Sequence, residues 1–286
     1  MQRKTFLSAT AALSFALLGG ALAASPVTVT ATSSAYKVPA QVSAGYVRFE
    51  LKNTDKTPHD LQIFKLNAGV GKAALVKAIS DFAMNGDAAA EPLMKAASFF
   101  GGVMSVDPGK SGSVGVTLEP GTYAVSSLSM NGDEKNPKAL AAQGFLEVFT
   151  VVKGASADAA PKTDYQVGLA DFAVALPATQ IKAGAQTWNV TNQGTQPHFL
   201  LVARLQPGKT QDDVMRFLMA PPEQQTGAPP LDMLGDQGAQ VLSPGKSNVV
   251  TMNLAPGTYF LACFIGDPKT QMPHAMLGMT QFFTVK

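Results

Sequence analysis

The chain carries the same series of short motifs twice, and this repeat limits its fold more than any other feature. The first two motifs recur at an offset of 139 residues, and the last two recur at an offset of 136 residues. Four motifs in one order predict two homologous domains, 25–153 and 164–286, joined by a small and polar linker, 154–163. The paired motifs are Ala44-Gly45 with Ala183-Gly184, Pro58-His59 with Pro197-His198, Pro108-Gly-Lys-Ser111 with Pro244-Gly-Lys-Ser247, and Pro120-Gly-Thr-Tyr123 with Pro256-Gly-Thr-Tyr259.

Each half is predicted to consist mostly of β-strands. Alternating apolar and polar residues are typical of half-buried strands, and Pro-Gly pairs mark turns between them. One helical insertion is expected at the same place in each half, with an apolar face toward the core. The fold class is therefore all-β, with two tandem antiparallel Greek-key β-sandwiches. The expected strands include 46–51, 187–190, 249–254 and 282–285, and the helical core residues are Leu75, Val76, Ile79, Phe82, Val214, Phe217 and Leu218.

The N-terminus predicts export from the cytoplasm. Residues 1–23 combine a basic start at Arg3-Lys4, an apolar run and the small-residue site Ala21-Leu22-Ala23, which is the pattern of a secretory signal peptide. Cleavage would leave equal numbers of basic and acidic side chains, so no nucleic-acid or anionic-membrane partner is expected. The expected localisation is periplasmic or extracellular, with no integral membrane segment after cleavage. An uncleaved anchor is the alternative, because the apolar run is nearly long enough to span a bilayer.

Candidate metal ligands gather in the second half. The only cysteine, Cys263, cannot form a disulfide within the chain. Downstream, the stretch 271–279 contains one of the three histidines and three of the methionines. Two imidazoles, one thiolate and a weak axial thioether are the ligands of blue-copper sites. The second half supplies this set in chain order as His198, Cys263, His274 and Met279.

These residues resemble the cupredoxin family, which includes plastocyanin, azurin and the copper domain of nitrite reductase. Pro197-His198 is similar to the family's first histidine at the end of a strand, and 256–263 resembles its Gly-x-Tyr-x-x-x-Cys strand. Four residues separate His274 from Met279, as in plastocyanin, and Gly278-Met279 has the family's Gly-Met ending. The resemblance implies one copper ion in the C-terminal domain, bound by the four candidate ligands.

Two departures from the family pattern concern the surroundings of the ligands. Ten residues lie between Cys263 and His274, where small cupredoxins have only a few. Phe199 follows the first histidine, where the family usually has a polar side chain. Because neighbouring hydrogen bonds orient metal ligands, the potential and colour of the site follow less directly from the resemblance than copper binding does.

The first half serves as an internal comparison, because it keeps only His59 of the four ligands. Ser127 stands where the second half has Cys263, Pro137-Lys138 is aligned with Pro273-His274, and Gly144-Phe145 with Gly278-Met279. We therefore expect a degenerate cupredoxin-like domain without copper ligands, in which His59 is an ordinary capping or surface histidine.

The expected function is one-electron transfer by an exported copper protein, with a redox partner docking on an apolar rim near His274. Three histidines exclude a trinuclear copper cluster, and the chain is expected not to be an enzyme and to have no catalytic residues. Two alternatives remain open. One is a Cu(I) carrier using Met272 and Met276, since thioethers favour Cu(I). The other is a metal-free scaffold, which a large separation of Cys263 from the histidines would favour.

Overall fold

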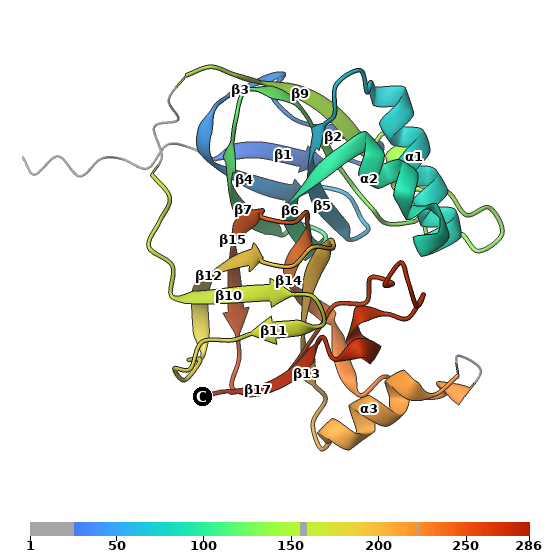
Figure 1. Ribbon diagram of the computed structural model, residues 1–286, viewed down its shortest axis with the longest axis vertical. Coiled ribbons are helices and arrows are strands. Elements are labelled where there is room, and N and C mark those ends of the chain that lie inside the picture. The colour runs from blue at the N-terminus through green and yellow to red at the C-terminus, as the bar shows by residue number, and fades with distance from the viewer. Residues whose placement is uncertain (1–25, 155–158, 222–223) are drawn as a thin grey trace, which may run out of the picture.

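The structure, a computed structural model, describes residues 26–154, 159–221 and 224–286 (Figure 1). The predicted signal peptide therefore lies outside the described residues. The strands of the first half are β1 (Val27–Ala31), β2 (Tyr36–Lys37), β3 (Gln41–Ser43), β4 (Gly45–Asn53), β5 (His59–Leu66), β6 (Ala97–Val106), β7 (Ser111–Leu118), β8 (Gly121–Ser126) and β9 (Leu146–Val152). Those of the second are β10 (Tyr165–Ala170), β11 (Ala173–Ala175), β12 (Gly184–Asn192), β13 (His198–Leu205), β14 (Leu231–Leu242), β15 (Ser247–Leu254), β16 (Gly257–Ala262) and β17 (Thr280–Val285).

Two sheets run through both halves of the molecule. One has eight strands in the order β11-β10-β12-β15-β7-β4-β1-β2, and the other has nine in the order β17-β16-β13-β14-β6-β5-β8-β9-β3. The predicted β-sandwich architecture is confirmed. The two sandwiches are also joined edge to edge, because β7 pairs with β15 and β6 pairs with β14. The domain boundaries remain a prediction.

The pairing of β7 with β15 relates the two halves by a local twofold axis. Val114 lies opposite Val250, and these two residues occupy equivalent positions of the repeat, 136 residues apart. In an antiparallel pair, two equivalent residues face each other only where a twofold axis passes between them. Each half therefore presents the same edge to the other.

The sheets are mixed, so the prediction of purely antiparallel sandwiches is wrong. β1 pairs in parallel with β4, and β10 pairs in parallel with β12. Between β1 and β4 the chain crosses to the other sheet, where β3 runs parallel to β9. Between β10 and β12, Ile181 makes the equivalent parallel bridge to Val285 of β17. When the chain crosses to the second sheet and back, its next strand in the first sheet can lie parallel to the strand it left.

Alternating side chains fill the sandwich interiors, and the predicted strands are all present. Trp188, Phe49, Tyr123, Phe149 and Leu261 are buried in one continuous core that spans both halves. Burial of each such side chain stabilises the folded protein by roughly 1.5–3 kcal/mol.

Helical segments cover the outer face of the nine-stranded sheet. The first insertion comprises α1 (Lys72–Asn85), the 3₁₀-helix η1 (Gly86–Ala89) and α2 (Ala90–Ala96). The second is α3 (Gln211–Met219), which begins with a capping box at Thr210 and Asp213. Leu75, Ile79 and Val214 are fully buried, and the predicted apolar faces do contact the core.

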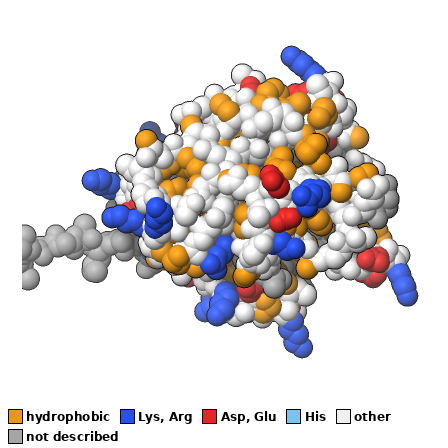
Figure 2. Space-filling view, turned by 90° about the horizontal axis from the view of Figure 1, so that it is seen from below, with side chains coloured by type: hydrophobic (Ala, Val, Ile, Leu, Met, Phe, Trp, Pro, Cys, Tyr) orange, Lys and Arg blue, Asp and Glu red, His pale blue; other side chains and the backbone are white. Residues whose placement is uncertain are grey.

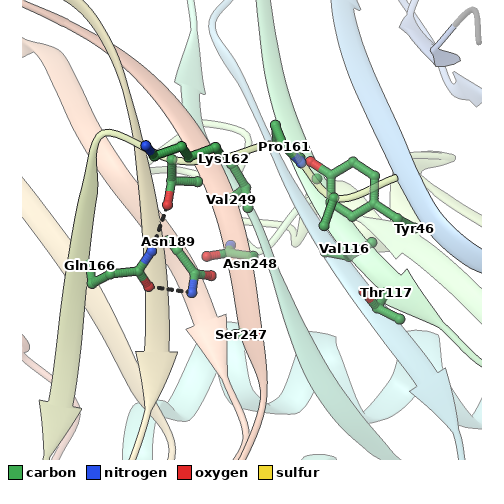
Figure 3. A pocket seen from close by; sticks show the side chains of 13 residues that line it. Tyr46, Val116, Thr117, Pro161, Lys162, Gln166, Asn189, Ser247, Asn248 and Val249 are labelled. Carbon is green, nitrogen blue, oxygen red and sulfur yellow. Dashed lines mark hydrogen bonds between the residues drawn. The ribbon is translucent and has the colours of Figure 1, made fainter. Parts of the chain in front are cut away.

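The end of the predicted linker and the start of the second half pack over the junction of the two halves. Gln166 accepts a hydrogen bond from Asn189 and donates one to Thr163 (Figure 3). Pro161 and Lys162 help to line a cavity of about 430 Å³ beside β4, β7 and β15. None of the four predicted copper ligands lines this cavity.

The surface view of one face shows basic and acidic side chains interspersed with hydrophobic ones (Figure 2). A single-sign patch of the kind that binds nucleic acid does not occur on this face. Among the residues that the structure describes, no helix has the length and hydrophobicity needed to cross a membrane.

The continuous sheets predict that both halves unfold together. Trp188, the only tryptophan, is buried in the second half, so its fluorescence reports on that half, whereas far-UV circular dichroism reports on both. We expect coincident denaturant transitions from the two probes, as two-state unfolding requires. Transitions with separate midpoints would show instead that the halves are independent domains.

Candidate metal centre

The four predicted ligands lie at the ends of adjacent strands in the second half. His198 is the first residue of β13, and Cys263 directly follows β16, which pairs with β13. His274 begins the 3₁₀-helix η4 (His274–Leu277), and Met279 precedes β17. All four side chains are buried. Pairing of β13 with β16 brings the first two ligands together, and the turn at η4 returns the other two to them.

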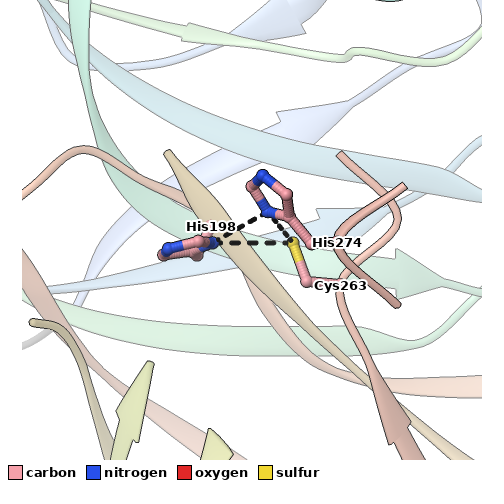
Figure 4. A group of neighbouring side chains, drawn as sticks. All are labelled: His198, Cys263 and His274. Atoms are coloured by element: carbon pink, nitrogen blue, oxygen red, sulfur yellow. Dashed lines mark hydrogen bonds between the residues drawn. The ribbon is translucent and has the colours of Figure 1, made fainter. Parts of the chain in front are cut away.

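Three of these side chains converge on one point (Figure 4). The Nδ1 atoms of His198 and His274 are 3.1 Å apart. The sulfur of Cys263 is 3.9 Å from Nδ1 of His198 and 3.6 Å from Nδ1 of His274. This convergence is the reverse of the separation that a metal-free scaffold would favour.

The outer nitrogen of each imidazole is held by an acceptor. Nε2 of His198 is 2.9 Å from Oδ1 of Asp171, and Nε2 of His274 is 2.9 Å from Oε1 of Gln196. The amide nitrogen of Gln196 donates to Asp267, which orients its oxygen toward His274. Each Nε2 therefore carries the proton, and each Nδ1 points its lone pair inward.

This arrangement fits a bound cation. Two Nδ1 lone pairs facing each other at 3.1 Å repel unless a positive charge lies between them. A trigonal ion held about 2.0–2.3 Å from nitrogen and sulfur donors separates those donors by about 3.5–3.7 Å, close to the spacings found here. Two imidazoles and a thiolate are donors that suit copper.

The surroundings of the ligands set their protonation. Burial lowers the pKa of His198 and of His274, which favours the neutral imidazole that a metal requires. Burial raises the pKa of the Cys263 thiol to about 11, against backbone hydrogen bonds from Phe199 and Ile265 that favour the thiolate. A metal at this site must displace the thiol proton, because the thiolate is the ligand.

Backbone hydrogen bonds fix Met279 relative to two other ligands. Its N–H donates to the carbonyl of His274 at 2.9 Å, and its carbonyl accepts from the N–H of Cys263 at 3.3 Å. Gly278, with a φ of 115°, makes the turn that lets the chain pass from η4 into this position. The backbone of the buried Met279 is thus held next to the backbones of His274 and Cys263.

Sequence reasoning missed the residues that hold the histidines. Asp171 lies in the loop between β10 and β11, 27 residues before His198. Burial acts to raise its pKa, but hydrogen bonds from Thr195, His198 and Gln196 outweigh burial and lower the pKa to about 2. No local pattern marks this aspartate. Gln196 lies two residues before His198, and this closeness to a predicted ligand was the one sequence feature that could have pointed to it.

The first half has the same hydrogen bonds around its histidine turn as the second half, but different side chains in place of the candidate ligands. The amide of Asn53 bridges Thr57 and Val106, as that of Asn192 bridges Gln196 and Leu242 in the second half. The equivalent histidine, His59, is buried, so the prediction of a capping or surface histidine is wrong.

His59 is held by other groups than those around His198. Its Nε2 is 3.0 Å from Asp55, and its ring stacks on Phe145 with centroids 4.5 Å apart. Among the described residues, its buried Nδ1 has no hydrogen-bond partner. The hydroxyl of Ser127 donates instead to the buried carboxylate of Asp60. Phe145 thus lies against the imidazole, where the second half places its converging ligands.

The structure also corrects the alignment of His274 with Lys138. The N–H of Leu140 donates to the carbonyl of Ser129, as that of His274 donates to the carbonyl of Ile265. Leu140 begins the 3₁₀-helix η2 (Leu140–Gln143), as His274 begins η4. The equivalent of His274 is therefore Leu140, because the first half has two more residues in this loop.

A second cavity, of about 480 Å³, lies between the first helical insertion and the candidate metal centre. Its wall includes Phe82 and Met94 of the insertion, and Phe199, Ile265 and Gly266 next to the ligands. Phe199 thus faces an apolar cavity on the side of β13 opposite to His198.

No protein-family model and no curated protein matches this chain. Its structure is similar to that of an auracyanin from Roseiflexus castenholzii, with 21% identity over 42% of this chain and 94% of that chain, at a TM-score of 0.29. It is also similar to a copper nitrite reductase from Nitrosomonas europaea, with 14% identity over 92% and 94%, at a TM-score of 0.26. A multicopper oxidase matches with 12% identity over 91% and 88%, at a TM-score of 0.25.

The comparisons correct the prediction that the chain is not an enzyme. Two of the structures that align with about nine-tenths of the chain are enzymes by name, the nitrite reductase and the multicopper oxidase. The count of three histidines excludes a trinuclear copper cluster, but it does not exclude catalysis at a single metal centre.

Gly194 allows Asp171 to approach His198, and its substitution should loosen this contact. A Cβ at Gly194 would lie 2.3 Å from Oδ1 of Asp171 and 2.7 Å from Nε2 of His198. We expect Gly194→Ala to lower the free energy of unfolding by about 2 kcal/mol in urea denaturation. Gly71→Ala, where a Cβ meets nothing within 4 Å, is the control. Equal stabilities of the two variants would contradict this role of Gly194.

Proposed function

We propose that this protein binds one copper ion through His198, Cys263, His274 and Met279, and that the site transfers single electrons. The observation that carries the proposal is the pair of inward Nδ1 lone pairs beside a buried thiol, each fixed by an acceptor on Nε2. A bound copper ion would supply reversible one-electron chemistry. A trigonal His₂Cys set with a weak axial methionine is the arrangement typical of electron-transfer copper.

The contribution of the chain is a rigid and dry donor set. Asp171 and Gln196 orient the two rings, and backbone N–H groups of Phe199 and Ile265 support the thiolate. All donors are buried, so water has little access to them. Ligands that are already held in place need little rearrangement when the charge of a bound metal changes, which favours fast electron transfer.

The proposed partner is a redox protein that docks over η4. Met272 and Met276, each two residues from His274, are 42% and 38% exposed. Exposed methionines form adaptable apolar contacts, as a transient interface needs. Export to the periplasm or the extracellular space remains part of the proposal, since it depends on residues 1–23.

Adding Cu(II) to the purified protein tests copper binding directly. We expect an intense thiolate-to-copper band in the visible spectrum and one ion per chain. Cys263→Ser should abolish the band and weaken Cu(II) binding by at least about 100-fold, because the only sulfur donor with a charge is lost. Ser127→Ala, at the equivalent position of the first half, is the control. A wild-type protein without the band would refute the blue-copper proposal.

The exposure of Met272 and Met276 also supports a second candidate function, the carriage of Cu(I). Electron transfer through the buried site predicts that Met272→Leu and Met276→Leu change Cu(I) affinity by less than about twofold, because leucine preserves the apolar surface. Carriage predicts a clear loss of affinity in either variant. Competition for Cu(I) with a chromogenic chelator distinguishes the two functions.

A further inference from the structure

We infer that the first half of the chain positions the copper ligands of the second half, through a bridge from Asp87 to the loop between Cys263 and His274. The inference builds on the proposed function and assigns a role to a half that lacks the ligand set. Asp87 lies in η1, within the helical insertion of the first half. In Figure 1 the loop that precedes η4 reaches the lower end of this insertion.

One hydrogen bond joins the two elements. The N–H of Gly266 donates to Oδ2 of Asp87 at 2.9 Å, across 179 residues of sequence. A Cβ at Gly266 would lie 2.4 Å from the same oxygen, so glycine is what permits this approach. A bond from an N–H to an ionised carboxylate is stronger than one between neutral groups.

Gly266 is adjacent to the residue that connects two ligands. The backbone N–H of Ile265 supports the thiolate of Cys263, and its carbonyl accepts from the N–H of His274 at 2.8 Å. Gly266 itself makes a β-bridge with Pro273, directly before His274. Holding Gly266 therefore holds the backbone that spaces Cys263 from His274.

On the side of the insertion, the loop borders a cavity, and Gln196 on the cavity wall donates to Asp267 of the loop. The cavity of about 480 Å³ separates it from the insertion, and Ile265, Gly266, Pro268 and Gln271 all face that cavity. The Asp87 bond crosses this space at one edge. In the first half Met130 occupies the position of Gly266, and it makes the equivalent β-bridge to Ala139.

The carboxylate of Asp87 also acts on the ligands through its charge. It lies one hydrogen bond from Gly266, which is three residues after Cys263 and eight before His274. A negative charge near a copper site stabilises Cu(II) over Cu(I), so Asp87 should lower the reduction potential. Asp87 is a positioning residue, because it contacts the loop and not the ligands.

Variants of the full-length protein separate the bond from the charge. Asp87→Ala removes both, whereas Asp87→Asn keeps an acceptor oxygen and removes the charge. Glu91→Ala is the matched control, because Glu91 lies in the same insertion and lines the same cavity, yet pairs only with Lys95 at the surface. Gly266→Ala should disrupt the same hydrogen bond, because its Cβ would clash with the carboxylate of Asp87.

Hydrogen exchange of the Gly266 amide, followed without metal, tests the bridge. We expect exchange to be at least about fivefold faster in Asp87→Ala than in the wild type or in Glu91→Ala, and Asp87→Asn to restore most of the protection. The double variant Asp87→Ala/Gly266→Ala should be less perturbed than the sum of the single variants. Unchanged exchange in Asp87→Ala would overturn the inference.

Copper loading then tests the effect on the site. Asp87→Ala should weaken Cu(II) binding by about fivefold, change the visible band and raise the reduction potential, and Asp87→Asn should raise the potential while keeping the band. If Asp87→Ala shows faster exchange but keeps the visible band, the Cu(II) affinity and the reduction potential of the wild type, Asp87 has no role at the metal. If wild type itself binds no copper, the proposed function fails, and the exchange experiment still decides the bridge.

Discussion

The mutual orientation of two buried imidazoles is the interaction on which the candidate centre depends. Asp171 and Gln196 accept from the Nε2 atoms of His198 and His274, and this leaves two unprotonated nitrogens facing each other. Such an arrangement is unfavourable by itself, because two acceptor nitrogens face each other and share only the weak donor of the Cys263 thiol. The strands, the turn at η4 and Gly194 all serve to maintain it. A site that resists collapse in this way is pre-organised for a cation.

The first half shows how the same frame accommodates the loss of that arrangement. Phe145 stacks on His59, the hydroxyl of Ser127 turns to Asp60, and Leu140 replaces an imidazole. The asparagines that brace the histidine turn are the same in both halves. The β-frame thus tolerates both interiors, since the stability of the sheets comes from burial that neither interior disturbs.

The sequence was sufficient for the strands, because alternation is a local pattern, and the resemblance to cupredoxins indicated the convergence of His198, Cys263 and His274. It was insufficient wherever position depended on the folded chain. Asp171 carries no local pattern, and the two extra residues before Leu140 displaced the alignment of Lys138. The joining of β7 to β15 also escaped prediction, since an exposed sheet edge and a paired one have the same alternation.

The twofold relation between Val114 and Val250 has a consequence for the origin of the chain. An interface in which each half offers the same edge is isologous, as in a symmetric homodimer. A gene that encoded one sandwich could have produced this assembly from two separate polypeptides. Fusion of two copies frees each to diverge, so that one can keep the converging histidines and cysteine while the other loses them.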